Sequence, residues 1–446
     1  MLLAIHFLAP ANRITGSANR FPTPARRFPT AANRFPTPAH DLTATANRFP
    51  TLASRVTGLA SWVTATNLGI TATNLPVAAT NLPPRAQTFR WHSPAGQYLC
   101  GMLLEENVSL RPYNTFGLDV RARYFARFAS ADELRQLLKL PQVQAAEKLI
   151  LGGGSNLLFT QDFNGVVLKN EICGLEILSE DAADTHTALL RAGAGESWHG
   201  LVEYSLDQNL SGIENLSLIP GTVGAAPLQN IGAYGAELRD TFDHLEAVEI
   251  STGALRVFTA GECGFGYRES VFKNTLKNQF VVTAVVLRLH RRAQPNVRYG
   301  AISETLAELG IEGEPTPQEV SRAVIYIRRS KLPDPAEIGN AGSFFKNPEV
   351  SQAKFDQLKN QYPELPGYPV PGGVKVPAGW LIERAGWKGL RRGAGAGTHG
   401  VHDRQALVLV NHGGATGGEV RQLAEEIISS VRQQFGIELH PEVNIL

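Results

Sequence analysis

Short apolar runs alternate with glycine-rich punctuation between residue 113 and about residue 292. The runs are rich in Val and Ile and short enough for buried β-strands, and they begin at Lys148, Gly165, Leu189, His244, Leu255 and Phe280. Two segments, 131–140 and 199–208, instead repeat apolar residues three and four positions apart, which predicts short helices. Many strands with few helices in one block favour an α+β domain built around sheets over a doubly wound parallel fold.

The pattern changes in the last third of the chain. Segments 318–330 and 419–435 have helical spacing, and they bracket a glycine-rich stretch at 386–400. The sequence Arg-Arg-Ala-Gln-Pro at 291–295 interrupts the preceding strand. A second domain is therefore predicted to begin near residue 293.

The first 101 residues have a different pattern, in which arginine and proline recur at intervals of seven residues. A proline in most repeats excludes a coiled coil, because each would remove a helical hydrogen bond, and the repeat is too short for a solenoid. The segment is expected to be a disordered low-complexity leader. Its arginine-rich, acid-poor composition also resembles a transit peptide or a nucleic-acid-binding arm.

A translated DNA repeat upstream of the true start is the alternative that we favour for this leader. The chain has two methionines, Met1 and Met102, and Met102 lies shortly before ordinary globular sequence. We expect the working protein to begin at Met102.

The composition of the rest of the chain, considered without the leader, adds little to the predicted function. The chain has a formal net charge of +1, but residues 1–101 hold nine Arg, no Lys and only Asp41 as an acid. The remaining 33 basic and 40 acidic residues give the rest a net charge of −7, which does not suggest a nucleic-acid or membrane partner. No apolar run approaches the length of a membrane-spanning helix.

Neither cysteine nor histidine spacing predicts a metal site. Cys100, Cys173 and Cys263 show no CxxC spacing, so a disulfide framework or zinc site is not expected and a reducing compartment is favoured. The eleven histidines form no HExxH pattern.

Two glycine-rich runs could hold a phosphorylated ligand. A buried strand runs into the sequence Gly-Gly-Gly-Ser-Asn at 152–156, where glycine allows backbone N–H groups to approach an anion. A second run, 219–227, leads into Gln-Asn-Ile-Gly-Ala-Tyr-Gly at 229–235. Two such loops would suit a long dinucleotide, although tight turns between strands explain each run equally well.

Three further positions could carry chemistry, each with an ordinary alternative. Arg268 could stabilise developing negative charge or simply pair with Glu269 or another acid. Glu442 lies between Pro441 and Val443 and could act as an acid or base, although most glutamates face solvent. Ser343 lies in the segment 339–348, which taken alone is predicted to be a glycine-rich loop with an aromatic plug.

Taken together and in order, these motifs resemble one family, the UDP-N-acetylenolpyruvoylglucosamine reductases. The resemblance runs almost continuously from residue 113 to residue 446. It rests on NTFG at 114–117, LGGGSN at 151–156, IPGTVG and NIGAYG within 219–235, FGYRESVFK at 265–273, KLPDP at 331–335, GNAGSFFKNP at 339–348, AGWLIE at 378–383 and PEV at 441–443.

The resemblance implies an α+β fold with two domains. After a lead-in at 102–117, an FAD-binding domain of the vanillyl-alcohol-oxidase (PCMH) type would cover 118–292, and a substrate-binding α+β domain 293–446. FAD would be held without a covalent bond. The implied cofactor-binding residues are Gly152, Gly153, Gly154, Ser155, Asn156, Gly221, Gly224, Asn230, Gly232 and Tyr234.

The implied activity is reduction of UDP-N-acetylglucosamine enolpyruvate to UDP-N-acetylmuramate for peptidoglycan, with NADPH as co-substrate in a ping-pong sequence. Arg268 and Glu442 would polarise the enolpyruvyl group and Ser343 would protonate it. The residues implied to grip the substrate diphosphate are Tyr299, Lys331 and Asn347, and Tyr299 resembles the subtype with an inserted tyrosine loop. A cytoplasmic monomer is expected.

Departures from the family pattern and two other functions remain open at this point. Asn444 stands where many relatives have a basic residue, and the stretch 391–401 is longer than usual. Another FAD-linked oxidoreductase of the same superfamily, or an inactive flavin- or nucleotide-binding module, is the alternative.

Overall fold

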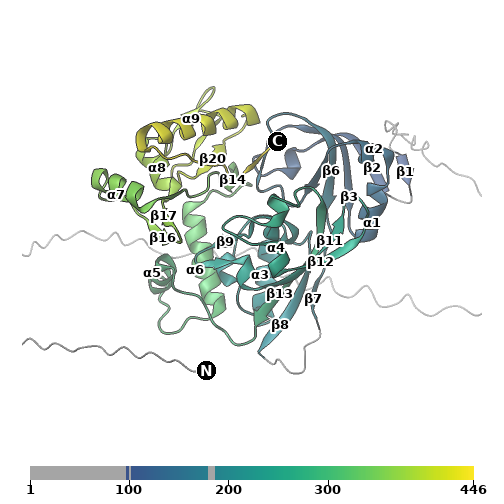
Figure 1. Ribbon diagram of the computed structural model, residues 1–446, viewed down its shortest axis with the longest axis horizontal. Helices are drawn as coiled ribbons and strands as arrows, with labels where there is room; N and C mark the ends of the chain where they lie inside the picture. The colour runs from purple at the N-terminus through teal and green to yellow at the C-terminus, as the bar shows by residue number, and fades with distance from the viewer. Residues whose placement is uncertain (1–96, 100–101, 179–185) are drawn as a thin grey trace, which may run out of the picture. The chain divides into compact units, whose positions relative to one another are not determined.

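The computed structural model describes residues 97–99, 102–178 and 186–446 (Figure 1). The predictions for the leader therefore lie outside the described residues, except at β1 (Gln97–Leu99). This short strand pairs antiparallel with β2 (Met102–Ser109), and Leu99 stands opposite Met102. The last residues of the predicted leader thus belong to the first sheet.

The first sheet has the strand order β1-β2-β3-β6-β4, with β3 at Arg121–Phe128, β6 at Phe163–Asn170 and β4 at Lys148–Leu151. Strands β3 and β4 both run parallel to β6, and α1 (Ala131–Leu138) and α2 (Pro141–Ala145) make the crossover. The predicted helix at 131–140 is confirmed because Ser130 caps α1 and buried leucines line one face.

The second sheet is antiparallel throughout, in the order β12-β11-β13-β8-β7. Its longest strand, β13, pairs with β11 and β8 and is buried along most of its length, in agreement with its mainly apolar sequence. The helix α3 (Trp198–Asp207) packs Trp198 into the same core and confirms the helix predicted at 199–208. The strand bounds are β7 Leu175–Ile177, β8 Thr187–Gly193, β11 Phe242–Glu249, β12 Leu255–Thr259 and β13 Phe280–His290.

Two helices after the second sheet form a small core of their own. Helix α6 (Pro317–Lys331), which the pattern at 318–330 predicts, packs against α5 (Gly300–Glu308). Tyr234 of the preceding segment packs against this core, and α6 also contacts the 3₁₀ turn η2 (Glu214–Leu216). The proposed domain boundary near residue 293 stays a prediction.

The C-terminal part consists of two small sheets and three helices. One sheet has the order β14-β20-β19-β18 and the other β15-β17-β16. The predicted helix at 419–435 is α9 (Gly417–Phe435), which begins at a capping box of Thr416 and Glu419. The remaining bounds are β14 Gly339–Ser343, β15 Glu349–Val350, α7 Gln352–Gln361, β16 Tyr368–Val370, β17 Gly373–Lys375, α8 Ala378–Arg384, β18 Arg391–Arg392, β19 His399–Val401 and β20 Val408–Asn411.

The prediction of a loop throughout 339–348 is wrong for its first half, because Gly339–Ser343 is the strand β14. Its first glycine is needed for close packing, since a Cβ on Gly339 would lie 2.3 Å from the Phe116 carbonyl oxygen. The register of β14 on β20 shifts between Asn340 and Ser343, where Gly342 has φ +68°. The predicted aromatic plug is confirmed, because Phe344 and Phe345 are buried.

The two ends of the described chain tie the C-terminal part to the first sheet region. Phe116 and Leu118 pack into the C-terminal core. At the other end, β21 (Asn444–Ile445) runs parallel to β5 (Leu157–Leu158), directly after the first glycine loop. Segments almost 290 positions apart therefore meet beside that loop, near the C label in Figure 1.

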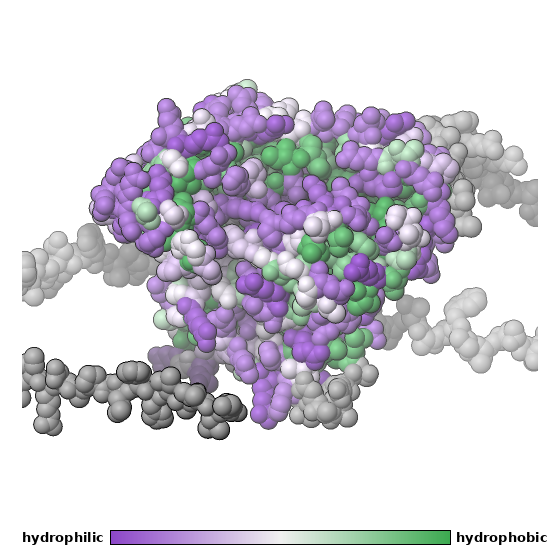
Figure 2. All heavy atoms as spheres, in the orientation of Figure 1, coloured by the Kyte–Doolittle hydropathy of each residue, from purple (hydrophilic) through white to green (hydrophobic). Residues whose placement is uncertain are grey.

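The visible surface carries mostly hydrophilic residues, with smaller hydrophobic areas between them (Figure 2). Among the residues described here, no helix combines the length and apolar character needed to cross a bilayer.

Candidate active site

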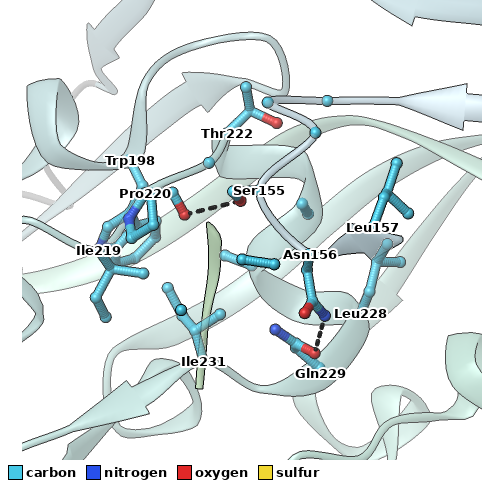
Figure 3. A pocket seen from close by; sticks show the side chains of 18 of the residues that line it. Ser155, Asn156, Leu157, Trp198, Ile219, Pro220, Thr222, Leu228, Gln229 and Ile231 are labelled. Carbon is cyan, nitrogen blue, oxygen red and sulfur yellow. Dashed lines mark hydrogen bonds between the residues drawn. The ribbon is translucent and has the colours of Figure 1, made fainter. Parts of the chain in front are cut away.

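The two glycine loops predicted to hold a dinucleotide line one cavity of about 270 Å³. They approach each other closely. Ser155 Oγ donates a hydrogen bond to the Pro220 carbonyl (3.2 Å), and Asn156 Nδ2 donates to Gln229 Oε1 (3.0 Å), as Figure 3 shows. Trp198 and Ile231 add apolar surface from either side.

Glycine is required in both loops because there is no room for a side chain between them. A Cβ on Gly153 would lie 2.8 Å from the Gly221 Cα, and a Cβ on Gly221 would lie 2.8 Å from Ser155 Oγ. Gly154 has φ +65°, and a Cβ there would lie 2.0 Å from the Tyr113 carbonyl oxygen. The backbone itself therefore forms this wall of the cavity.

This wall can bind an anion. Within the described residues, the backbone N–H groups of Gly153, Gly154, Ser155 and Asn156 donate to no protein acceptor. Several successive unpaired N–H groups in a glycine-rich turn are the usual cradle for a diphosphate. The structure thus favours the phosphate-loop interpretation over that of a plain strand connector.

Arg268 enters the cavity from a tight turn, and its backbone has φ +55°. Its guanidinium donates to the carbonyl oxygens of Gly232 and Asn230. Its Nε lies 3.1 Å from Glu442 Oε1, and both side chains are largely buried. The alternative of an ion pair with Glu269 or another acid is therefore confirmed in its second form, because Arg268 pairs with Glu442 from the other end of the chain and not with Glu269.

Glu442 is positioned by backbone bonds on both sides. Its N–H donates to the Phe344 carbonyl (2.8 Å), and its carbonyl accepts from Asn156 Nδ2 (3.3 Å). Burial raises the pKa of Glu442, while the positive charges of Arg268, Lys273 and Lys346 oppose that rise. A carboxyl whose pKa is raised beside a guanidinium is suited to exchange a hydrogen bond or a proton with a ligand.

Ser343 lies in the same cavity wall, at the end of β14. Its side chain is exposed, and in the described part of the chain its hydroxyl has no hydrogen-bond partner. The structure therefore brings Arg268, Ser343 and Glu442 to one cavity, as the sequence predicts, although they lie up to 174 positions apart.

Three of the predicted cofactor residues do not line the cavity. Gly224 packs against Ala194, directly after β8, where a Cβ on Gly224 would lie 2.6 Å from that of Ala194. Asn230 is fully buried, and its side chain donates to Glu237 Oε2 (2.9 Å) and the Gly266 carbonyl (3.0 Å). Tyr234 packs edge to face on Tyr299, with ring centroids 5.4 Å apart. The predicted cavity residues Gly152, Gly153, Gly154, Ser155, Asn156, Gly221 and Gly232 do line it.

The predicted diphosphate-gripping residues also lie outside the cavity wall. Tyr299 is exposed before α5, and Lys331 is exposed at the end of α6. Asn347 Oδ1 accepts a hydrogen bond from the Ala378 N–H (2.9 Å), at the start of α8. Their proposed contacts with substrate stay predictions.

The sequence interpretation missed Arg328, which lines the cavity from α6. Its guanidinium donates to the Leu218 carbonyl (3.2 Å), and among the described residues no carboxylate pairs with it. Local sequence offered no clear signal for it, because an arginine on a helix usually faces solvent. Thr222, Gln229 and Asn444 are further cavity residues outside the predicted set.

No group of three or more His, Cys, Asp or Glu side chains in the described ranges could hold a metal ion.

Comparison with known proteins matches both halves of the described chain. Residues 122–259 match the family model of an FAD binding domain, and residues 334–446 match that of the C-terminal domain of UDP-N-acetylenolpyruvoylglucosamine reductase. A reductase of that name from Burkholderia ambifaria is 51% identical over 335 residues, covering 75% of this chain and 94% of the relative. A Pseudomonas aeruginosa relative of the same name is also 51% identical, covering 77% of this chain and 98% of its own.

A solved structure agrees with these matches. The Thermus caldophilus UDP-N-acetylenolpyruvylglucosamine reductase is 25% identical, with a TM-score of 0.51, and the match covers 77% of this chain and 99% of that one. The expected α+β fold with an FAD-binding domain followed by the family's C-terminal domain is confirmed. The unpaired N–H groups of the first glycine loop fit the FAD diphosphate. The chain belongs to the UDP-N-acetylenolpyruvoylglucosamine reductase family.

Proposed function

We propose that this protein uses NADPH to reduce UDP-N-acetylglucosamine enolpyruvate to UDP-N-acetylmuramate, a precursor of peptidoglycan. The observation that carries the proposal is the convergence of Arg268, Ser343 and Glu442 on the cavity that the glycine loops line. A dinucleotide cradle beside a cation, a hydroxyl and a buried carboxyl suits hydride transfer to a carbon next to a carboxylate.

The glycine loops would hold FAD through backbone N–H groups, with Gly152, Gly153 and Gly154 on one side and Gly221 on the other. Bound there, FAD would supply hydride transfer between NADPH and the methylene carbon of the substrate. Asn230 and Gly232 would contribute indirectly, because their carbonyl oxygens hold the Arg268 guanidinium. Gly224 and Tyr234 would shape the same loop from behind.

Arg268 and Glu442 would act on the carboxylate side of the enolpyruvyl group. Addition of a hydride to the methylene carbon leaves negative charge on the adjacent carbon and its carboxylate. The largely buried Arg268 guanidinium would stabilise that charge. Glu442 holds the guanidinium at 3.1 Å and, with its raised pKa, can donate a hydrogen bond when protonated.

Ser343 would deliver the proton that completes the reduction. Its hydroxyl is free of protein partners in the described residues, and it lines the cavity with Arg268. A serine hydroxyl is a weak acid, so it can protonate only a strongly basic carbon that is held within reach. The product is the D-lactyl ether.

Substrate recognition would involve Tyr299, Lys331 and Asn347 at the diphosphate. Lys331 supplies a point charge, and Tyr299 and Asn347 supply directional hydrogen bonds. The exposed position of Tyr299 next to Tyr234 supports its assignment to a clamping tyrosine loop. All three lie outside the cavity wall. This part of the proposal therefore requires the segments that carry them to move toward the substrate when it binds.

We extend the proposal to organisation and location. The FAD-binding domain would span 118–292 and the substrate domain 293–446, with residues 102–117 as a lead-in. The enzyme would act as a monomer in the cytoplasm, because NADPH and nucleotide sugars are available there. Size-exclusion chromatography with light scattering tests the monomer, since a dimer would double the measured mass.

One assay tests the activity. The purified full-length chain should show flavin absorbance and consume NADPH when UDP-N-acetylglucosamine enolpyruvate is added. A Ser343→Ala variant should still be reduced by NADPH but should be reoxidised by substrate at least about 100-fold more slowly, because general acid catalysis contributes that much. Flavin-loaded wild-type protein without substrate-dependent NADPH consumption would reject the function, and equal loss of both half-reactions in the variant would reject the role of Ser343.

A further inference from the structure

Two neighbouring residues of one turn, Arg268 and Glu269, each meet an opposite charge from the C-terminal part of the chain. Arg268 Nε lies 3.1 Å from Glu442 Oε1, and Glu269 Oε1 lies 2.5 Å from Lys346 Nζ. Glu269 also accepts a hydrogen bond from Asn274 Nδ2 (3.0 Å). The four charged side chains alternate in sign across the contact.

The partners Lys346 and Glu442 are fixed relative to each other by the backbone. The Lys346 N–H donates to the His440 carbonyl (2.9 Å), and the Glu442 N–H donates to the Phe344 carbonyl (2.8 Å). Between these two bonds, Phe345 and Pro441 form an isolated antiparallel β-bridge. Lys346 and Glu442 therefore move as one unit. Ser343 belongs to the same unit, since it directly precedes the buried Phe344 and Phe345.

The turn that carries Arg268 and Glu269 is equally well tied. Gly266 and Glu269 exchange backbone hydrogen bonds, and Lys273 Nζ donates to the Arg268 carbonyl (3.4 Å). Because Arg268 has a positive φ, its direction depends on these bonds and on whatever holds the next residue. Glu269 is that next residue, and Lys346 holds it.

We propose that the Glu269–Lys346 ion pair is a positioning device that sets Arg268 against Glu442 and Ser343 across the two domains. The inference deepens the proposed function and rests on it. The alternation of charge also determines which residue of the turn pairs with which residue of the C-terminal part. A shift that brought Arg268 to Lys346 would place like charges together, as would a shift that brought Glu269 to Glu442.

The electrostatics of the cluster agree with this role. Partial burial alone would raise the pKa of Glu269, but the hydrogen bonds from Lys346 and Asn274 and the charge of Lys346 outweigh it, so that pKa is lowered. Burial and the neighbouring Lys346 lower the pKa of Lys273. Three cations, Arg268, Lys273 and Lys346, lower the pKa of Glu442 against the effect of burial, and Tyr267 also interacts with this carboxyl.

Charge reversal of the pair tests the proposal on the full-length holoenzyme. Glu269→Lys and Lys346→Glu should each slow flavin reoxidation by substrate about 10- to 100-fold, the loss expected from a small displacement of reacting groups. Reduction of the flavin by NADPH should change much less. The double variant with both reversals should recover part of the lost rate, because it restores the Glu269–Lys346 pair with opposite polarity. Recovery should stay incomplete, because two cations then face two acids and the alternation of charge is lost.

Milder variants guard against misfolding of the reversed ones. Lys346→Arg keeps the charge and should stay near the wild-type rate, whereas Lys346→Met should slow reoxidation without loss of bound flavin. A Lys359→Met variant, on α7 and outside the cluster, is the matched control.

Three results would overturn the inference: normal reoxidation in Lys346→Met, a double variant no faster than the slower single one, or equal slowing of both half-reactions. Failure of the proposed function can be told apart from failure of this inference, because wild-type protein would then show no substrate-dependent reoxidation of its flavin.

Discussion

Gly153 has space for nothing larger than hydrogen, although its φ is not among the positive values. We expect Gly153→Ala to push the two glycine loops apart, since its Cβ would lie 2.8 Å from the Gly221 Cα. The purified variant should contain much less flavin, measured as the ratio of visible to ultraviolet absorbance. Gly261→Ala is the control, because a Cβ there meets nothing within 4 Å. Equal flavin content in both variants would contradict the close-approach argument.

Glu442 should make stability depend on pH in a defined direction. Burial raises its pKa above the ordinary value of 4.5, so the folded protein holds this proton more tightly than the unfolded chain. The stabilising contribution is complete below pH 4.5 and is lost as pH rises through the folded pKa. We expect the free energy of unfolding of wild type, relative to that of Glu442→Gln, to fall as the pH rises from 4.5 through the folded pKa. Urea titrations of both proteins at several pH values measure it, and a rising difference would contradict the assignment.

At the scale of elements, the second sheet carries an ion pair that spans a strand. Arg191 on β8 makes two hydrogen bonds to Glu246 on β11, of 2.8 and 2.7 Å, across β13. The bond from Arg191 lowers the pKa of Glu246 below its ordinary 4.5. The pair therefore stabilises the fold above pH 4.5 and loses that effect as pH falls through the folded pKa.

Glu246→Gln should accordingly cost about 1 kcal/mol at pH 7 and less in acid, because the two bonds are bidentate but partly exposed. Denaturant unfolding at pH 7 and pH 4 measures the difference. Arg421→Gln, whose partner Glu425 is well exposed, is the control and should change stability little at either pH. A Glu246 effect that grows in acid would rule out this account.

Helices were predictable wherever the apolar period and the cap agreed. The periods at 131–140 and 419–435 predict α1 and α9 to within two residues, and each begins at a side-chain cap, Ser130 or Thr416. Strand β14 was missed because its glycines are an argument against a strand in isolation. What makes it a strand is its antiparallel pairing with β20, where Gly339 stands opposite Asn411, and local sequence does not contain that contact.

For the molecule as a whole, the candidate site was predictable only by the order of its motifs. Arg268, Ser343 and Glu442 each had an ordinary explanation by itself, and no spacing rule links them. Their family resemblance named them, and the structure brings them to one cavity. Arg328 escaped because a helical arginine is most often solvent-facing, and its burial depends on the separate packing of α6 against η2 and the α5 core.

The segment 444–446 joins the two domains. Its backbone pairs with β5, the Asn444 N–H donates to the Asn156 carbonyl (3.1 Å), and Thr160 donates to the Leu446 carbonyl through N–H (2.7 Å) and hydroxyl (2.6 Å). Glu442 and the first glycine loop are therefore held in the same local structure. Loss of the segment should loosen the C-terminal domain from the FAD-binding domain.

Deletion of residues 444–446 should thus slow flavin reoxidation by substrate and lower the midpoint temperature of unfolding, because it removes the pairing of β21 with β5 and leaves only the packing of Phe116, Leu118 and Leu158 in the C-terminal core. Differential scanning calorimetry of the holoenzyme measures the second effect. Asn444→Ala is the matched control, since it removes only the side-chain bond to the Asn156 carbonyl (3.2 Å) and leaves the strand pairing. If the deletion and the control unfold at the same temperature, the strand pairing does not couple the domains, and the position of Glu442 depends on its contacts with Phe344, Asn156 and Arg268.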